Sequence, residues 1–432
     1  MKATVIGGGI IGLSSALYLQ QDGWEVTVLD KGTLADNCSF GNMGYLSPSH
    51  FATLAQPGVI NQGILWMFQK KSPFYVRPEL SPQLIDWGLK FYRACNANHV
   101  QRSAKPMLDL LLLSKELTRS WIQTGILSFE YAEKGCINYF QTKKYEKSEL
   151  ENVYVGRDLG LQIDVLSKEE IHELEPDLKA EVRGAAWYKD DAHLQPNELM
   201  NQLIALLKKR GVNIITEAEV TGFQRADSTI TAVQYKLTSQ PEILKSETDM
   251  VVLAAGSWSS DLARLAGEKI PLMPGKGYSM TIQPAKQLLH HPCILVEAKV
   301  AMTPWQQQLR IGSTMEIGSI NDKILFPRVQ GILEAVGRYF PAYKQERAFQ
   351  ELSDEKNLKT KLREKVWYGF RPLSADGLPY IGFGKKSSNL ILATGHAMLG
   401  ISMGAGTGKL VAELAAGEKT SIPAKAFDPG RY

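Results

Sequence analysis

Three glycines near the start of the chain have the spacing of a phosphate-binding turn. Gly7, Gly9 and Gly12 form the pattern G-x-G-x-x-G between an apolar segment at 3–7 and a segment at 10–22 with apolar residues at helical spacing. The first glycine permits a tight bend, the second lets the backbone approach a pyrophosphate, and the third allows close packing of helix on strand. The helix N-terminus then offers free N–H groups to the phosphates. The motif predicts a dinucleotide site, with a ligand-free glycine-rich turn as the alternative.

An acidic residue follows at the position where a ribose would lie. Residues 25–30 predict a second strand that ends at Asp30, whose carboxylate can accept hydrogen bonds from a ribose diol and disfavours the 2′-phosphate of NADP. We expect Ile10, Ile11 and Lys31 to lie beside the same ligand. Strand, helix and strand together predict a right-handed βαβ unit of Rossmann type.

The chain beyond the second strand departs from the regular repeat of an NAD domain. Residues 33–60 are rich in Gly, Ser, Asn and Pro and predict a long ordered loop, which in a compact domain is usually functional. Within it, the run CSFGNMG at 38–44 offers small and polar groups to a pyrophosphate or a flavin ring. Rossmann-like elements resume only near residue 196, and the small residues of AAGSW at 254–258 end a later strand. This interrupted layout favours FAD over NAD.

The remaining apolar patterns predict an α/β chain with more than one domain. A helix at 196–210, strands at 212–216, 250–254 and 389–394, and a last helix at 401–416 continue the nucleotide-binding part. Segments at 278–284, 293–302 and 308–314 predict a second sheet, followed by a helix at 322–340.

Composition excludes several classes of function. The 49 basic and 45 acidic residues give a formal charge of +4, which is too mild to indicate nucleic-acid binding. Four scattered cysteines without CxxC spacing predict neither a metal site nor a disulfide framework. No stretch reaches the roughly 18 apolar residues that span a bilayer. We therefore expect a cytoplasmic protein; nothing in the sequence indicates an oligomeric state.

Motifs spread along the chain together carry a family resemblance. They are GGGIIG at 7–12, SFGNMG at 39–44 with Ser47-Pro48, PGKGYS at 274–279, GFRP at 369–372 with Asp376-Gly377 and Pro379, and TGH at 394–396 with Leu399-Gly400. As a set, over nearly the whole length, they resemble the D-amino-acid oxidase superfamily of flavoproteins. The stretches PGV at 57–59 and WMFQ at 66–69 are most similar to the bacterial D-amino-acid dehydrogenases (small subunit type), with glycine oxidase next.

The resemblance implies a fold and a division into domains. It implies an α/β protein with a Rossmann-like FAD-binding domain of GR2 type and an α+β substrate domain built on a mixed antiparallel sheet that roofs the flavin. The expected FAD-binding domain is discontinuous, from residues 1–60, 190–262 and 364–432. Residues 61–189 and 263–363 form the expected substrate-binding domain.

The resemblance also implies how FAD is held. The cofactor would lie extended and non-covalently bound, with adenine near Asp30 and Val220 and the isoalloxazine near residues 42–46 and 395–402. Further contacts are implied at Ser39, Asn42, Met43, Gly44, Leu46, Ala255, Gly256, Gly369, Gly395, Leu399, Gly400, Ile401 and Ser402. The N-terminus of the last helix would stabilise an anionic reduced flavin with its partial positive charge.

An enzyme that oxidises amino acids must hold a carboxylate, and three residues are candidates for the substrate site. Arg371 matches the family's carboxylate-binding arginine, and its planar guanidinium can bond both carboxylate oxygens. Tyr278 is expected to bond the carboxylate or to cover the substrate, with a core tyrosine as the alternative. His396 is expected to contact flavin or substrate, with a structural histidine as the alternative. Tyr45 and His50, in the loop near the flavin, are weaker candidates, and no residue stands out as a general base.

The expected reaction is hydride transfer from Cα of a D-amino acid to flavin N5. The imino acid then hydrolyses to a 2-oxo acid and ammonia, or stays a cyclic imine if the substrate is D-proline or a D-hydroxyproline. Residues 300–304 read VAMTP where glycine oxidase carries an active-site tyrosine, which weakens a glycine oxidase assignment and leaves room for a bulky or cyclic substrate. The alternatives are a glycine- or sarcosine-type amine oxidase that uses oxygen, and a flavin-carrying subunit of a larger dehydrogenase complex.

The dehydrogenase resemblance implies that electrons pass to a quinone or another respiratory acceptor. Residues 64–71 (ILWMFQKK) combine aromatic and apolar side chains with lysines, which is typical of a peripheral contact with a membrane surface. Such a contact would be with the inner membrane. A buried helix with a charged end is the alternative.

Overall fold

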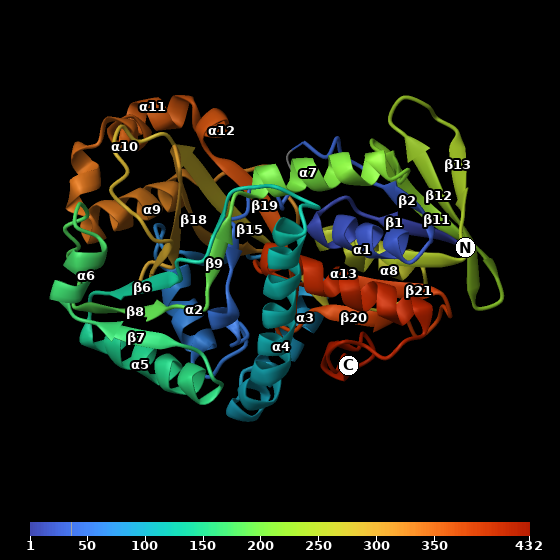
Figure 1. The fold of residues 1–432 in the computed structure, drawn as a ribbon, viewed down its shortest axis with the longest axis horizontal. Helices are drawn as coiled ribbons and strands as arrows, with labels where there is room; N and C mark the ends of the chain where they lie inside the picture. Colours follow the sequence, from blue (N-terminus) through green and yellow to red (C-terminus); the bar gives the residue numbers. More distant parts are fainter. Residues whose placement is uncertain (36) are drawn as a thin grey trace.

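The computed structural model describes residues 1–35 and 37–432 as an α/β fold with two large sheets. Figure 1 shows a six-stranded sheet in the right half and a nine-stranded sheet in the left and centre, with the long helix α4 (Ala97–Gln123) between them. Both sheets are covered by helices, so each buries a hydrophobic core of its own. The α/β class and the two-sheet architecture expected from the sequence are confirmed.

The six-stranded sheet contains the expected βαβ unit. Its strands, in order across the sheet, are β10 (Asn213–Ile215), β2 (Glu25–Leu29), β1 (Lys2–Ile6), β14 (Met250–Leu253), β21 (Leu390–Thr394) and β20 (Tyr380–Phe383). All neighbours are parallel except β20, which runs antiparallel to β21. The parallel strands are apolar and rich in β-branched residues, as expected for strands that are buried on both faces.

Two helices on this sheet begin at the same end of the molecule. Helix α1 (Ile10–Gln21) follows β1, and helix α13 (Gly400–Ala416) lies alongside it in Figure 1. Glycines make the close approach possible: a Cβ at Gly404 would lie 2.6 Å from the Ile10 side chain, and one at Gly408 would lie 2.6 Å from the Ser14 backbone. The packing thus fixes both helix N-termini next to each other.

The nine-stranded sheet is mixed. Its order is β19 (Trp367–Ser374), β15 (Leu272–Ile282), β18 (Gln308–Ile317), β17 (Val300–Trp305), β16 (Cys293–Leu295), β6 (Cys136–Phe140), β8 (Gly184–Tyr188) and β7 (Ile163–Leu166), with β4 (Phe74–Val76) paired to β18. The segment at 293–302, expected as one strand, forms two antiparallel strands, because the chain turns between Leu295 and Val300 and Lys299 adopts φ +52°. Lys299 therefore lies immediately before the first residue of β17 rather than inside a strand.

The pairing of strand β19 indicates where the substrate-binding domain ends and the FAD-binding domain resumes. This strand lies within the segment 364–432 that the sequence assigned to FAD binding, yet it pairs with β15 in the nine-stranded sheet. We therefore propose that the chain returns to the FAD-binding part after Ser374 rather than at residue 364.

The remaining elements cover the sheets or connect them. The other helices are α2 (Val59–Met67), α3 (Pro82–Ala94), α5 (Lys143–Asp158), α6 (Lys168–Leu174), α7 (Pro196–Lys209), α8 (Ser259–Leu265), α9 (Phe326–Tyr339), α10 (Arg347–Ser353), α11 (Glu355–Thr360) and α12 (Leu362–Lys365). Two small sheets comprise β3 (Tyr45–Leu46), β9 (Ala192–Leu194) and β5 (Tyr131–Ala132), and β11 (Ala218–Ala226), β12 (Thr229–Leu237) and β13 (Ile243–Glu247).

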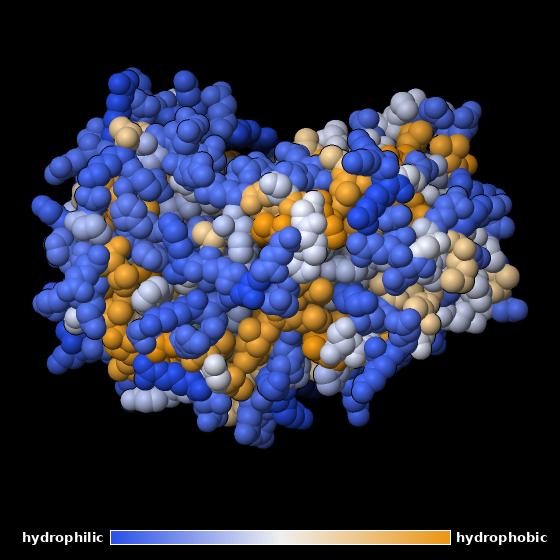
Figure 2. Space-filling model, in the orientation of Figure 1, coloured by the Kyte–Doolittle hydropathy of each residue, from blue (hydrophilic) through white to orange (hydrophobic). Residues whose placement is uncertain are grey.

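Most of the face shown in Figure 2 is hydrophilic, and hydrophobic side chains gather mainly in its lower half. No helix in the described part of the chain combines the length and the apolar character needed to cross a membrane.

A buried ion pair ties the C-terminus to the fold. Arg431 donates through Nε to Oδ2 of Asp376 at 2.7 Å and through Nη2 to Oδ1 at 2.9 Å. The two side chains are only 13% and 11% exposed. Burial by itself would raise the pKa of Asp376, but the hydrogen bonds and charge of Arg431 outweigh it and hold that pKa below its ordinary value.

We expect Asp376→Asn to lower the free energy of unfolding by about 3–5 kcal/mol at pH 7, because it leaves Arg431 buried and unpaired. Since the folded-state pKa of Asp376 is depressed, its contribution is present above the unfolded pKa of about 3.9 and is lost as pH falls through the folded value. Urea unfolding of both proteins from pH 7 downward should therefore show the difference shrinking below about pH 4. A difference that stays constant to pH 3 would contradict this account.

Candidate active site

A cavity of about 2040 Å³ runs between the two sheets. It is lined by the turn after β1, the loop that follows β2, the start of α13, and residues of β15, β17, β18 and β19. The cavity therefore lies where the carboxyl ends of the parallel strands face the mixed sheet, which is where open α/β folds bind ligands.

The glycine-rich turn has the backbone geometry that the motif predicted. Gly7 has φ +111°, and a side chain there would overlap with the carbonyl of Ala254. A Cβ on Gly12 would overlap with the carbonyl oxygen of Gly7, so helix α1 packs on the turn with no room for a side chain. Gly9 faces the cavity, and Ser39 Oγ accepts a hydrogen bond from the N–H of Ile10 at 2.9 Å. The turn thus exposes the start of α1 to a ligand phosphate.

Asp30 lies at one end of the cavity with Lys31 and Val220. Its carboxylate accepts hydrogen bonds from the N–H groups of Gly8 at 2.6 Å and Gly32 at 2.7 Å. These contacts fix the carboxylate beside the glycine-rich turn, in the position expected for a ribose contact.

The loop expected to lie near the flavin is held from the mixed sheet by Arg310, a residue that the sequence did not single out. Arg310 is buried on β18, and its Nη1 donates to the carbonyls of Phe40 at 2.7 Å and Asn42 at 2.6 Å. Thr303 on β17 donates to the carbonyl of Met43 at 2.7 Å. Burial lowers the pKa of Arg310 to about 10, which still leaves it charged at neutral pH. The charged guanidinium of Arg310 therefore fixes the loop through hydrogen bonds to two backbone carbonyls.

The first turn of α13 faces the cavity through Leu399, Gly400, Ile401 and Ser402. The hydroxyl of Ser402 donates to the carbonyl of Tyr45 at 2.6 Å, which joins the helix start to the loop that contains Asn42. The N–H groups of a first helical turn have no partner within the helix, so they are available to a ligand. Two helix N-termini, those of α1 and α13, therefore face one cavity.

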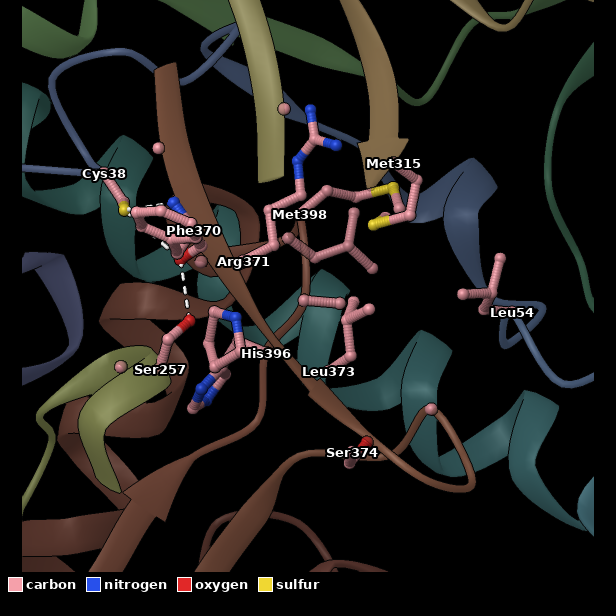
Figure 3. Close-up of a pocket in the computed structure, with 18 of the residues that line it drawn as sticks. Cys38, Leu54, Ser257, Met315, Phe370, Arg371, Leu373, Ser374, His396 and Met398 are labelled. Carbon is pink, nitrogen blue, oxygen red and sulfur yellow. Dashed lines mark hydrogen bonds between the residues drawn. The ribbon is translucent and has the colours of Figure 1, made fainter. Parts of the chain in front are cut away.

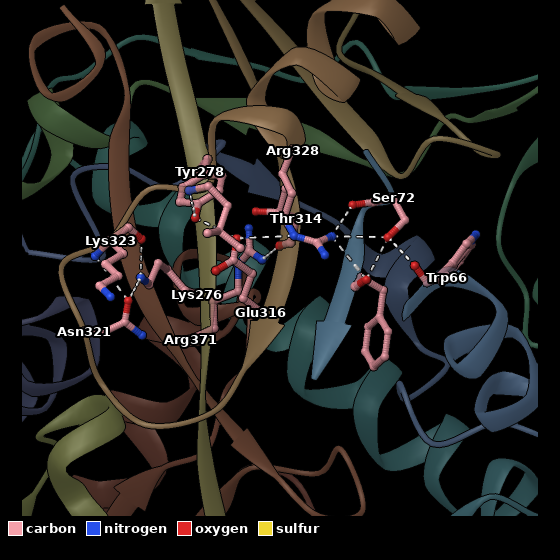
Figure 4. A network of polar contacts seen from close by, with 12 residues as sticks. Trp66, Ser72, Lys276, Tyr278, Thr314, Glu316, Asn321, Lys323, Arg328 and Arg371 are labelled. Carbon is pink, nitrogen blue, oxygen red and sulfur yellow. Dashed lines mark hydrogen bonds and ion pairs between the residues drawn. The ribbon is translucent and has the colours of Figure 1, made fainter. Parts of the chain in front are cut away.

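Arg371 is the cation on the cavity wall that the sequence predicted. Figure 3 shows it on β19 among Phe370, Leu373 and Met315. Its Nη1 donates to the carbonyl of Thr314 (Figure 4), and no carboxylate of the described residues lies within 4.0 Å of its guanidinium. Burial lowers its pKa to about 10. A desolvated cation without an anion is costly unless a ligand supplies one.

Two neighbours position this guanidinium. A side chain on Gly277 of β15 would overlap with it, so the glycine makes the room in which Arg371 lies. Thr314 has φ +76°, which is a strained conformation for a β-branched residue, and it presents the carbonyl that Arg371 binds. Strained backbone of this kind is concentrated at functional sites.

Tyr278 lines the cavity, but its hydroxyl already has two hydrogen-bond partners within the protein. Its hydroxyl donates to Oε1 of Glu316 at 2.6 Å and accepts from the N–H of Leu325 at 3.0 Å (Figure 4). The side chain is 1% exposed and packs in the core of the nine-stranded sheet. These contacts favour the alternative of a core tyrosine, and a contact between Tyr278 and the substrate carboxylate stays a prediction.

His396 lies beside the cavity and is buried, with 3% exposure. Its Nε2 lies 2.9 Å from Thr407 Oγ1, and its Nδ1 has no hydrogen-bond partner among the described residues. Burial lowers its pKa to about 3, so the imidazole is neutral at physiological pH. It can therefore exchange a hydrogen bond with a ligand but is a poor proton acceptor.

Most other predicted contacts line this cavity, and a few support it from outside. Those on the wall are Ile10, Ile11, Ser39, Asn42, Met43, Ala255, Gly256 and Gly369. Four predicted residues lie outside the lining, namely Gly12, Gly44, Leu46 and Gly395. Gly44 and Gly395 have φ of +78° and +82°, so they shape the turns that carry the lining residues. The weaker candidates Tyr45 and His50 both line the cavity, and the Tyr45 hydroxyl donates to the carbonyls of Cys293 and Met302.

The residues present fit an extended FAD. The glycine turn leaves a side-chain-free approach at a helix N-terminus, and Asp30 marks a ribose position. At the other end, the start of α13 and the unpartnered Nδ1 of His396 can bond the polar edge of a flavin. The cavity volume exceeds the usual 300–1,000 Å³ of a small-ligand site, as a dinucleotide with a substrate requires.

Comparison with known proteins shows the family to which the chain belongs. A family model described as FAD dependent oxidoreductase (DAO) matches residues 2–414. A protein named D-amino acid dehydrogenase from Neisseria meningitidis serogroup C is 31% identical over 441 residues, covering 100% of both chains. One from Vibrio vulnificus (strain CMCP6) is 28% identical over 439 residues, again covering 100% of both.

Solved structures share the fold at lower identity. Glycine oxidase from Geobacillus kaustophilus superposes with a TM-score of 0.74 at 22% identity, covering 100% of this chain and 98% of that one. L-Proline dehydrogenase from P. horikoshii gives a TM-score of 0.73 at 22% identity, with coverage of 100% and 97%. The fold and the family resemblance expected from the sequence are confirmed. The chain therefore belongs to the FAD-dependent oxidoreductases of the D-amino-acid oxidase type.

Proposed function

We propose that this protein is a FAD-dependent D-amino-acid dehydrogenase that oxidises its substrate at Cα and passes the electrons to a quinone or another respiratory acceptor. The observation that carries the proposal is the unpaired guanidinium of Arg371 on the wall of a cavity that fits FAD. A substrate carboxylate there would complete two charge-assisted hydrogen bonds. The full-length relatives named D-amino acid dehydrogenase support the substrate class.

The protein side of the reaction is chiefly positioning. When bound, FAD supplies the two-electron acceptor, and the oxidised imino acid then hydrolyses to a 2-oxo acid and ammonia. Arg371 holds the carboxylate, and Gly277 and Thr314 hold Arg371. The first turn of α13 stabilises negative charge that develops on the cofactor, by an amount of roughly 0.3–2 kcal/mol. With His396 neutral, we propose that the substrate reacts as the free amine.

We also propose that the cofactor is held without a covalent bond. The cysteine nearest to the loop that Arg310 holds is Cys38, whose Sγ lies 3.2 Å from both the N and the O of Phe370. Backbone and glycine contacts at two helix N-termini provide the binding energy instead.

An exposed apolar surface favours a membrane-borne acceptor. Only Gly63 of α2 is buried, so the alternative of a buried helix at 64–71 is wrong. The apolar side chains of α2 and α3 that face solvent are Ile64, Leu65, Met67, Phe68, Ile85, Leu89 and Tyr92, and Leu80 lies between the helices. Ile64, Met67, Ile85 and Tyr92 also line the cavity. We propose that this surface rests on a membrane, with lysines such as Lys70 and Lys71 at its edge, and admits a quinone.

Anaerobic flavin bleaching tests the proposed function. The purified yellow protein is mixed with D- and L-amino acids, glycine, sarcosine, and both enantiomers of proline and hydroxyproline. Flavin released into the supernatant by acid gives the loading and checks the non-covalent link. We expect bleaching by D-amino acids and not by their L-enantiomers. A yellow protein that no compound bleaches would remove the amino-acid assignment.

The bleached enzyme then tests the acceptor. We expect a soluble quinone analogue to restore the yellow colour much faster than air-saturated buffer. The reverse order, with hydrogen peroxide formed, would favour an oxygen-using amine oxidase instead.

A further inference from the structure

The cavity has a second polar region that the proposed function does not use. Lys299, His50, Glu149 and Asn138 all line the same cavity as Arg371. Lys299 is the cation of this group, and its charge contributes to the lowered pKa of His50, which burial reduces to about 4. His50 is therefore neutral, and the region contains one ammonium and one carboxylate.

The ammonium of Lys299 is not neutralised by a direct partner. It makes no hydrogen bond and no ion pair within 4.0 Å among the described residues. The side chain is exposed to the cavity. Desolvation by the surrounding protein lowers its pKa, and the charges of Glu149 and Glu297 partly oppose that shift. Glu149 instead accepts from Asn138 Nδ2 at 2.7 Å and from the hydroxyl of Tyr188 at 2.8 Å.

Glu297 is engaged elsewhere too. Its Oε1 accepts from the N–H groups of Gln141 at 2.8 Å and Thr142 at 3.0 Å, and Tyr339 donates to its other oxygen. Both acids near Lys299 thus accept hydrogen bonds from other residues. The N–H groups of the ammonium are therefore available to a ligand in the cavity.

Hydrogen bonds link both Lys299 and Arg371 to strand β18. Arg371 binds the carbonyl of Thr314, and the hydroxyl of the preceding residue, Ser313, donates to the carbonyl of Lys299 at 2.8 Å. The backbone of Lys299 and the side chain of Arg371 therefore contact consecutive residues of β18. Lys299 is also held in the left-handed region, with φ +52°, where a side chain is disfavoured. The small residues Ala301 and Ser313 line the same cavity.

We propose that Lys299 forms a second anion subsite, so that the preferred substrates are D-amino acids whose side chain ends in a carboxylate, such as D-glutamate or D-aspartate. The inference rests on the proposed function and names its substrate class. Arg371 binds the α-carboxylate, and the side-chain carboxylate reaches past Ala301 to the ammonium. A neutral amide of the same shape offers no charge to Lys299 and leaves that cation unpaired.

The test compares charged and neutral substrates of matched shape. Anaerobic bleaching rates are measured with FAD-loaded protein for D-glutamate, D-glutamine and D-alanine, in the native chain, in Lys299→Met and in Lys144→Met. Lys144 lines the same cavity but bonds Gln62 at 3.2 Å, so it serves as the control cation. The readout is the ratio of kcat/KM for D-glutamate to that for D-glutamine.

We expect the native chain to favour D-glutamate over D-glutamine by at least about tenfold, because a charge-assisted hydrogen bond is lost with the amide. Lys299→Met should bring the ratio close to one, through a rise in KM for D-glutamate, while Lys144→Met preserves it. A native ratio near one, or a loss in Lys299→Met that is equal for both substrates, would overturn the inference while D-alanine still bleaches the flavin. If no D-amino acid bleaches the native protein, the proposed function itself fails.

Discussion

Replacing Arg371 with alanine is expected to lower kcat/KM for a D-amino acid by roughly 30-fold to several thousand-fold, with FAD still bound. Truncating one partner of a buried charge pair costs about 2–5 kcal/mol, and each 1.4 kcal/mol is a factor of ten. In the free protein the guanidinium has one backbone acceptor, Thr314, and no acidic partner among the described residues, so little folding energy depends on it. The loss should therefore appear as weaker substrate binding, measured by anaerobic bleaching against substrate concentration.

Two variants separate charge from geometry at this position. Arg371→Lys retains a cation but cannot form two parallel hydrogen bonds, so its kcat/KM should fall between those of the native chain and the alanine variant. Gly277→Ala keeps the arginine but places a methyl group where the guanidinium lies, so it should raise KM as well. An alanine variant that purifies without flavin would show that Arg371 holds the cofactor rather than the substrate.

The parts of the site that the sequence predicted are those encoded by local pattern. Gly7, Gly12 and Asp30 lie within one βαβ unit, where the spacing of residues alone fixes their geometry. Arg371 was found through motifs around it, since a single arginine before a proline has no local signature. In each case the residues that support the prediction lie close together in the sequence.

The parts that were missed depend on contacts between distant segments. Arg310 holds carbonyls more than two hundred residues away, and no local pattern in β18 indicates that partner. Lys299 was assigned to the interior of a single strand, because an apolar run does not show where a chain turns. Its place in the cavity follows only from that turn.

The hydrogen-bond partners of Tyr278 are another feature that the sequence did not predict. Gly275, Gly277 and Ser279 alternate with Tyr278 along β15, so one face of this strand is built from small residues. The room left by Gly277 is taken by the guanidinium of Arg371. Glu316 and Leu325 bind the Tyr278 hydroxyl from distant segments, so no local pattern in the motif PGKGYS indicates these contacts.

The second large effect is expected at Gly12, which lies outside the cavity lining. A methyl group on Gly12 would overlap with the carbonyl oxygen of Gly7, and neither backbone segment can move without separating α1 from β1. We expect Gly12→Ala to purify without FAD and to lose about 3 kcal/mol or more of unfolding free energy. Flavin absorbance per chain and a thermal unfolding curve measure the two effects.

Gly88→Ala is the matched control for this substitution. Gly88 lies within α3, and a Cβ there would meet no atom within 4 Å. The same chemical change should therefore leave FAD bound and stabilise the helix by about 0.5–1 kcal/mol. If Gly12→Ala instead stayed yellow with an unchanged unfolding temperature, close packing of α1 on the turn would not be what creates the phosphate site. The phosphate site would then depend only on the absence of a side chain at Gly9, which lets the backbone approach the ligand.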